Sequence, residues 1–197
     1  MTTPEAIVGA RGMRADARRN HERIVEAARE AFAEHGPEAQ MDDVARRAGV
    51  GVGTLYRHFQ TKEALVGELI RLKLSAFAAR ARAALEEEGD PWELFAGVLR
   101  DQAEVMATDA AHQRMTFASS QESVDHAQPA IDELSEAMEE LLRRAKRSGA
   151  LREDVTVADI RTLMCGLGSV MAADRLSVMR YDWRRQLELM LAGLRAR

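Results

Sequence analysis

Residues 41–59 read MDDVARRAGVGVGTLYRHF, two short segments with helical spacing joined by a turn that contains glycine. In the first segment Val44 and Ala45 can face inward, and Val50 and Leu55 can fill the space between the two segments. This layout is typical of a helix-turn-helix, whose second helix enters the major groove of DNA while its first helix crosses the backbone. The segment therefore predicts a DNA-binding unit.

The charge around this segment favours contact with DNA, although the whole chain is acidic. The 197 residues include 28 basic and 32 acidic side chains, which give a formal net charge of −4. Residues 44–62, however, hold four basic side chains and no acid. These are Arg46, Arg47, Arg57 and Lys62. Residues 11–23 add five arginines, Arg18 among them, against two acids, and basic groups beside phosphates release counterions and so gain affinity.

A longer string resembles a known family. The first predicted helix ends in FAEHG, and MDDVARRAGVGVGTLYRHFQTKEAL follows four residues later. Together they resemble the DNA-binding domain of TetR-type (tetracycline-repressor-type) transcriptional regulators over about residues 14–70. The resemblance implies an all-α fold and an Ω-shaped homodimer, in which an N-terminal three-helix unit binds DNA and a larger helical domain dimerises and binds a small molecule. Beyond residue 70 only the length and the helical layout match.

The resemblance also implies which residues contact DNA. The contacting positions of the family motif fall on Thr54, Tyr56, Arg57, His58 and Lys62. Tyr56 and Lys62 are expected to touch the phosphate backbone, and Arg57 is expected to read a base, with two hydrogen bonds to guanine. The residues themselves add three candidates for phosphate, through their charge or an open backbone amide. These are Arg18, Arg46 and Gly53.

Some of these residues have plainer interpretations, and the motif departs from the family at two positions. Arg46 and Arg47 fit a solvated helix face equally well, Tyr56 and Phe59 fit the core, and His58 fits a helix end. Gly51 stands where many members carry Ser or Thr as the cap of the second helix, and glycine lacks the hydroxyl that could contact phosphate. Gln40 stands where Thr or Ser is commoner.

Spacing and punctuation divide the chain into about nine helices, and no run alternates as a strand does. The helices are expected at about residues 16–35, 41–48, 53–59, 61–87, 91–107, 110–119, 129–148, 156–175 and 182–194. Thr61, Asp90 and Asp182 are expected N-caps, Gly49 is expected to end the second helix, and Pro129 is expected to open the seventh helix. The expected domains are a flexible arm at 1–13, a helix-turn-helix domain at 14–60, and an effector-binding and dimerisation domain at 61–197.

The C-terminal part is acidic, with 16 basic and 21 acidic side chains in residues 74–197, and is not expected on DNA. Its last two predicted helices each carry an apolar stripe. The family resemblance implies that these stripes form a four-helix interface across a two-fold axis. The stripe residues are Leu163, Leu167, Val170, Met171, Trp183, Leu187, Met190, Leu191 and Leu194. Packing inside one subunit is the alternative for the same stripes.

A ligand pocket is expected among the middle helices, because methionine adapts its shape and lines accommodating cavities. The candidate lining is Phe95, Leu99, Gln102, Met106, Met115, Phe117, Met138 and Met164. Ordinary core is the alternative for each of them. The function expected is a repressor that binds a palindromic double-stranded operator as a homodimer and leaves it when a small hydrophobic effector binds. The alternative is a ligand-independent DNA-binding dimer whose C-terminal domain only dimerises or binds a protein.

Other classes of protein find little support. The five histidines and Cys165 have no metal-ligand spacing, Gly-x-Ser-x-Gly is absent, and Gly166-x-Gly168 lacks the third glycine of a dinucleotide site. We therefore expect no enzyme, no cofactor and no metal. The longest apolar run, residues 163–173, is too short for a membrane span of about 20 residues, so we expect a cytoplasmic protein.

Overall fold

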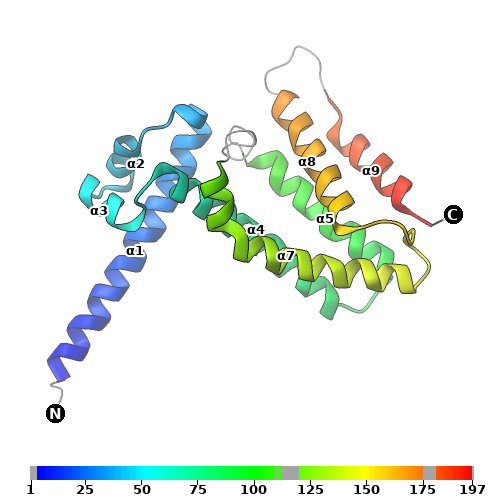
Figure 1. Cartoon of the computed structure of the whole chain (residues 1–197), viewed down its shortest axis with the longest axis horizontal. Helices are drawn as coiled ribbons and strands as arrows, with labels where there is room; N and C mark the ends of the chain where they lie inside the picture. Colours follow the sequence, from blue (N-terminus) through cyan, green and yellow to red (C-terminus); the bar gives the residue numbers. More distant parts are fainter. Residues whose placement is uncertain (1–3, 110, 112–119, 175–180, 197) are drawn as a thin grey trace.

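The computed structural model describes residues 4–109, 111, 120–174 and 181–196, and in these ranges the chain is helical and has no strand (Figure 1). The all-α fold expected from the sequence is confirmed. The helices are α1 (Pro4–His35), the 3-10 helix η1 (Gly36–Glu38), α2 (Met41–Ala48), α3 (Val52–His58), α4 (Lys62–Glu86), α5 (Pro91–Thr108), α7 (Gln121–Arg147), α8 (Val157–Asp174) and α9 (Trp183–Leu194). Nearly all of the helix expected at 110–119 lies outside the described residues.

Local capping chemistry sets most helix boundaries. Thr61, Asp90 and Asp182 each accept a hydrogen bond from the backbone N–H three residues further on, at 2.9–3.0 Å. This satisfies one of the donors that the first turn of a helix leaves unpaired. Gly49 ends α2 with a φ of 62°, a left-handed conformation that glycine adopts without strain. The expected caps at these positions are confirmed.

Two helices start earlier than expected. α1 begins at Pro4, so the stretch expected to be a flexible arm is helical from that residue, and proline suits the first turn of a helix. α7 begins at Gln121, because the Ser120 side chain caps it by accepting from the Ser123 N–H at 3.2 Å. Pro129 therefore lies inside α7 rather than at its start. It removes a single backbone donor, and the tertiary packing of α7 outweighs that loss.

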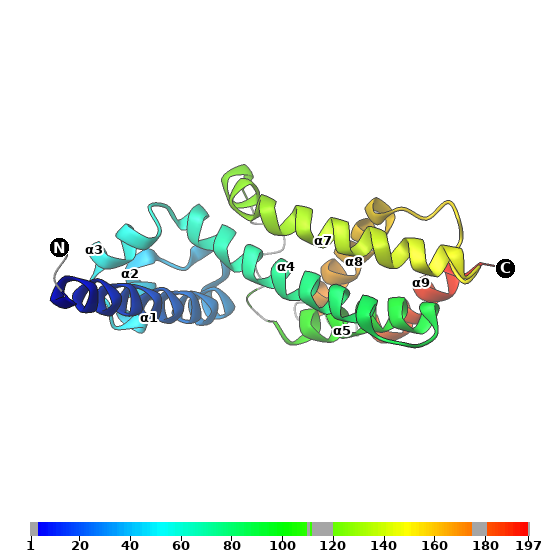
Figure 2. The ribbon, with the colours of Figure 1, turned by 90° about the horizontal axis from the view of Figure 1, so that it is seen from below.

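The N-terminal unit has a small core of its own. It is built from Ile24 and Phe32 of α1, Val44 of α2, Leu55 of α3 and Leu65 of α4, which are at most 1% exposed. α2 and α3 form the expected helix-turn-helix and pack against α1 (Figures 1 and 2). The core therefore fixes the orientation of α3, whose outer face is left to solvent.

α4 belongs to both units. Its first half contributes Leu65 and Val66 to the N-terminal core, and its second half contributes Ala81 and Ala84 to the C-terminal core. α7 lies along α4 in both ribbon views (Figures 1 and 2). The domain boundary between residues 60 and 61 stays a prediction, because α4 is one continuous helix that connects the two cores.

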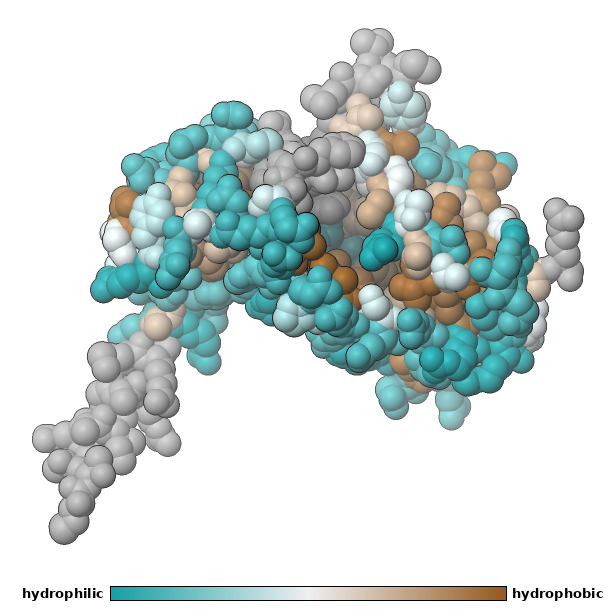
Figure 3. Space-filling model, viewed as in Figure 1, coloured by the Kyte–Doolittle hydropathy of each residue, from teal (hydrophilic) through white to brown (hydrophobic). Residues whose placement is uncertain are grey.

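The second core is formed by α4, α5, α7, α8 and α9. Its fully buried side chains include Phe95, Leu141 and Leu167. Figure 3 shows hydrophobic residues gathered on the visible face of this C-terminal lobe, whereas the N-terminal lobe is mostly hydrophilic there. Among the described helices, none is long and apolar enough to cross a membrane.

Candidate nucleic-acid interface

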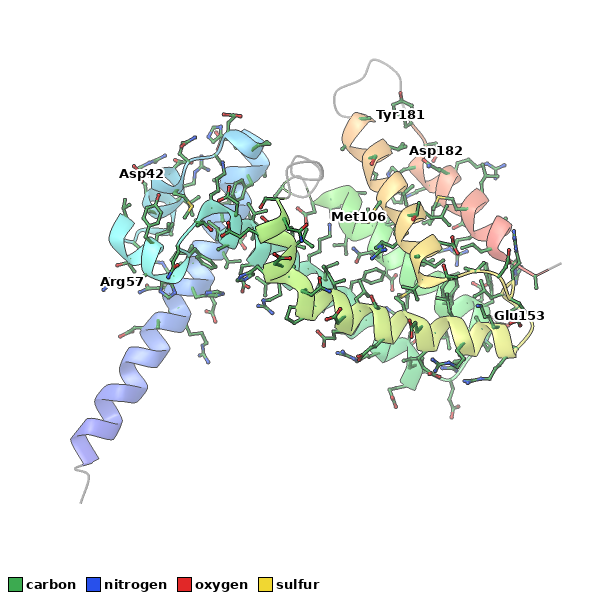
Figure 4. The ribbon with its side chains drawn as sticks, in the orientation of Figure 1. Asp42, Arg57, Met106, Glu153, Tyr181 and Asp182 are labelled. Atoms are coloured by element: carbon green, nitrogen blue, oxygen red, sulfur yellow. The ribbon has the colours of Figure 1, made fainter. Side chains whose placement is uncertain are left out.

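The outer face of α3 is the surface that the helix-turn-helix presents. Leu55 is fully buried, whereas Tyr56 is 44% exposed and Gly53 and Arg57 are exposed as well. A Cβ added at Gly53 would meet nothing within 4 Å, so the first turn of α3 is open. Figure 4 places Arg57 at the outer edge of the N-terminal unit. The structure thus brings three of the predicted DNA contacts onto one accessible strip.

Arg57 is oriented by its own helix. Its Nη2 atom donates to Thr54 Oγ1 at 2.9 Å, which explains why Thr54 is half-buried beneath it. In the described part of the chain, no carboxylate lies within ion-pair distance of Arg57. Its planar guanidinium therefore keeps donors for an acceptor pair on a base edge or for a phosphate.

In the folded structure, neighbouring carboxylates neutralise part of the positive charge of residues 44–62. Asp43, one residue before the run, pairs with Arg46 and with Arg47 Nε at 2.7 Å. Arg47 also donates to Glu34 Oε2 at 2.6 Å, so it links α2 to α1. The hydrogen bond from Arg47 lowers the pKa of Asp43. Arg47 is therefore held in the unit's own structure, while Arg46 stays exposed at its surface.

Lys62 has an internal role beside the predicted phosphate contact. Its Nζ atom donates to the Pro37 carbonyl oxygen and lies 5.8 Å from the centroid of the Phe32 ring. It thus ties the start of α4 to the link between α1 and α2. Nothing local in the sequence indicates this contact, because Pro37 is 25 residues away.

The two remaining predicted contacts lie away from the exposed strip. His58 is half-buried, with its ring centroid 6.2 Å from that of His21. Burial lowers the pKa of His58, and the charges of His21 and Arg57 lower it further. Arg18 is exposed on α1 and pairs with Glu22 at 3.6 Å. Arg23, which sequence reasoning missed, donates to the Gly49 carbonyl at 3.3 Å and supports the turn between α2 and α3.

A cluster of charged and polar side chains around Glu68 joins the two units, and the sequence analysis did not predict it. This carboxylate is 4% exposed and bonds to Arg71 Nε at 2.6 Å, His21 Nε2 at 3.0 Å and His126 Nε2 at 3.3 Å. Burial alone would raise the pKa of Glu68, but hydrogen bonds from Arg71, His126 and His21 outweigh burial and lower the pKa to about 2. Glu68 therefore stays charged and connects α1, α4 and α7.

Nearby contacts tighten the same junction. The Ser123 hydroxyl donates to the Glu63 carbonyl at 3.0 Å, and the Thr61 hydroxyl donates to Glu122 Oε1 at 2.5 Å. A Cβ on Gly67 would come within 2.9 Å of the Ser123 carbonyl oxygen, so α7 approaches α4 here at a distance that only glycine permits. The first turns of α7 are thus fastened to the start of α4.

The candidate ligand residues pack in the C-terminal core. Six of them are buried: Phe95, Leu99, Gln102, Met106, Met138 and Met164. Met115 and Phe117 lie outside the described residues. Leu99 and Met164 line a narrow apolar cleft with an accessible volume of about 10 Å³, which is partly open to solvent. Its other lining residues are Ile160, Leu163, Leu187, Met190, Leu191 and Leu194.

The structure buries part of the expected dimer stripe inside the subunit, which was the alternative for these residues. Five of its members are buried in the subunit's own core: Leu167, Met171, Leu187, Leu191 and Leu194. α8 and α9 each have one apolar stripe, and these five side chains pack in the core of their own subunit. They therefore have little surface left for contact with a partner subunit. The other four are half-buried and stay a prediction: Leu163, Val170, Trp183 and Met190. The outward faces carry small side chains instead, with Cys165 and Gly166 on α8 and Ala192 and Gly193 on α9, beside Leu189 at 55% exposure.

Comparisons with known proteins agree with this architecture. The model of the bacterial regulatory proteins of the tetR family matches residues 24–69, and that of the C-terminal domain of SbtR-like transcriptional regulators matches residues 90–196. An HTH-type transcriptional regulator of Staphylococcus aureus (strain USA300) is 44% identical over 66 residues. That match spans 33% of this chain and only 36% of the relative's length.

Solved structures match over nearly the whole chain. The TetR transcription regulatory protein from Mycobacterium vanbaalenii is 33% identical, with a TM-score of 0.61, over 93% of this chain and 99% of that one. FadR from Bacillus subtilis, in complex with stearoyl-CoA, shares the fold with a TM-score of 0.70 at 23% identity, over 88% and 99% of the two chains. The C-terminal model spans more than half of the chain and the first structure matches it almost end to end, so the chain belongs to the TetR family of bacterial transcriptional regulators.

Proposed function

We propose that this protein acts in the cytoplasm as a dimeric repressor, which binds a near-palindromic DNA operator and leaves it when a small apolar ligand binds. The observation that carries the DNA-binding part is the outer face of α3. Tyr56, Arg57 and Gly53 are exposed there, while Leu55 anchors the helix in the core. Two such helices about one DNA turn (~34–36 Å) apart fit successive major grooves.

The dimer is proposed to form through the outward faces of α8 and α9. Cys165 and Gly166 on α8, with Ala192 and Gly193 on α9, permit the close approach that a four-helix interface needs. Exposed Leu189 would be covered by the partner. Sedimentation of the purified protein tests this directly, because a monomer at micromolar concentration contradicts the dimer.

Operator binding is tested with one arginine on α3 and a matched arginine in the other domain. Arg57→Ala is expected to cost about 1–3 kcal/mol of operator affinity and to relax the preference at one base pair per half-site. Arg184→Ala is the control, because Arg184 is also exposed but pairs with Glu104 at 2.8 Å on the C-terminal domain. Affinities are measured by fluorescence anisotropy on a duplex selected from a random library. Equal affinity for the two variants would contradict the role of α3.

Release by ligand is proposed to run through α4 and α7. The second half of α4 contributes to the core that contains the cleft, and its first half is fastened to α7 by the Ser123, Glu122 and His126 contacts. A ligand that shifts α7 or α4 would therefore reorient α3 relative to its partner and weaken binding. Long-chain acyl compounds are the first class to test, since the similarly folded FadR from Bacillus subtilis is in complex with stearoyl-CoA.

The ligand-independent dimer remains the second candidate, and the size of the cleft favours it. Ordinary ligand sites enclose about 300–1,000 Å³, whereas the cleft among the described residues has an accessible volume of about 10 Å³. Titrating the protein–operator complex with acyl-CoA esters of increasing chain length separates the two. Release at one chain length supports the ligand-controlled repressor, whereas an unchanged complex with every ester favours the ligand-independent dimer.

A further inference from the structure

Val52, the first residue of α3, stands out among the side chains of the recognition face. It is 41% exposed, although valine is a residue type usually found inside proteins. Among the described residues, six large hydrophobic side chains are exposed, and Val52 and Tyr56 place two of them on this seven-residue helix. They are four residues apart and so lie on the same side of α3.

The neighbours of Val52 leave its side chain protruding. It lies between Gly51 and Gly53, and a Cβ on either glycine would have no atom closer than 4.0 Å. The isopropyl group therefore protrudes at the start of the recognition helix, with a glycine on either side of it. A β-branched side chain has few rotamers to lose, so fixing it against a partner costs little conformational entropy.

The chemistry of valine selects one feature of the major groove. It can neither donate nor accept a hydrogen bond, so the donor and acceptor edges of the bases offer it nothing. The C5-methyl group of thymine is the apolar feature of the major groove, and apolar side chains contact it there. The first residues of a recognition helix are also the ones that reach base edges.

We propose that Val52 is a specificity-determining residue, which selects thymine at one position of each half-site by covering its methyl group. This inference rests on the proposed binding of an operator by α3. Val52 and Arg57 then recognise different features of the half-site. The arginine binds hydrogen-bond acceptors on a base edge, and the valine contacts a thymine methyl group. The contact removes about one methyl group from water, which corresponds to roughly a fourfold gain in affinity per half-site.

Replacing thymine by uracil removes that methyl group and nothing else, so it tests the contact atom by atom. An operator is first selected from random duplexes, and each thymine of one half-site is then replaced by deoxyuridine in turn. Affinities are measured by fluorescence anisotropy at fixed salt for the unchanged protein, for Val52→Ala and for Val105→Ala. Val105 is the matched control, because it is a valine 51% exposed on α5.

The unchanged protein and Val105→Ala are expected to lose about fourfold in affinity at one thymine position. Val52→Ala is expected to bind the thymine operator about fourfold more weakly per half-site and to show no further loss when that thymine becomes uracil. Identical losses for Val52→Ala and the unchanged protein at every thymine overturn the assignment of Val52 and leave the proposed operator binding intact. A selection that returns no preferred duplex overturns both.

Discussion

Glu68 and Lys73 are both buried charges on α4, five residues apart, and they differ in what surrounds them. Glu68 is 4% exposed and bonds to Arg71, His21 and His126. The Lys73 side chain is 14% exposed, and its nearest carboxylate is Asp109, at 3.8 Å. Among the described residues its Nζ atom has no hydrogen-bond partner. One helix therefore carries a buried charge that is solvated by the protein and another that is not.

The pKa shifts of Glu68 and Lys73 reflect this difference in hydrogen bonding. The hydrogen bonds of Glu68 outweigh its burial and lower its pKa to about 2, which favours the charged form. Burial lowers the pKa of Lys73 to about 8, against partial compensation by Asp109, which disfavours the charged form. A buried charge stabilises a fold only where hydrogen bonds replace the water it has lost. We infer that Glu68 stabilises the junction of the two units and that Lys73 costs stability there.

The largest expected effect is the loss of the Glu68 charge. Glu68→Gln is expected to lower the free energy of unfolding at pH 7 by about 3 kcal/mol, since a pKa shift of that size measures the preference for the charged form. Urea unfolding followed by circular dichroism measures the loss. Protein concentration is held constant, because dimer stability depends on it.

Glu188→Gln is the matched control for this prediction. Glu188 also accepts two hydrogen bonds from an arginine, Arg100, at 2.8 and 3.0 Å, but its side chain is 48% exposed. Water screens such a pair, so the expected loss is below about 1 kcal/mol. Equal losses for the two variants would mean that burial and the histidines add nothing to the Glu68 cluster.

A smaller effect of the opposite sign is expected at Lys73. Lys73→Met is expected to raise the free energy of unfolding at pH 7 by about 2 kcal/mol, because methionine fills a similar volume without a charge to desolvate. The same urea experiment measures the gain. Lys146→Met, in the last turn of α7, is the control and is expected to change stability by less than about 0.5 kcal/mol. A clear loss at Lys73 would contradict the comparison.

Sequence reasoning succeeded where the determining residues are neighbours along the chain. The caps Thr61 and Asp90, and the glycine that ends α2, act within one helical turn, so their patterns predicted helix boundaries well. The family resemblance pointed to residues of α3 that the structure shows to be exposed, and their contact with DNA stays a prediction. The Glu68 cluster had no such signal, because its histidine partners lie 47 and 58 residues away.

The stripes of α8 and α9 show why a sequence pattern alone does not locate a subunit interface. A helical stripe such as Leu187 and Leu191 indicates that one face is buried, yet the same pattern suits a subunit core and a subunit interface. The structure assigns these side chains to the core and leaves small residues such as Gly166 outside. Asp43 is a further example, since it neutralises part of a basic run from a position just outside it.

The smallest expected effect is a change in the free energy of unfolding with pH that arises from the titration of Lys73. Its pKa is about 8 in the folded state and 10.5 as the ordinary value, so between these values the unfolded chain holds more protons. Stability from this group therefore rises with pH through that window. The advantage of Lys73→Met over the unchanged protein is expected to shrink by about 1 kcal/mol between pH 7.5 and 9.

The stability contributed by Glu68 also rises with pH, but in an acidic window at the other end of the scale. Its folded pKa is lowered, so its contribution is complete above pH 4.5 and is lost as the pH falls toward about 2. Paired urea titrations at pH 7.5 and 9 should therefore leave the difference between Glu68→Gln and the unchanged protein constant while the Lys73→Met difference narrows. A constant Lys73→Met difference would show that Lys73 is solvated after all, and that the two buried charges of α4 are alike.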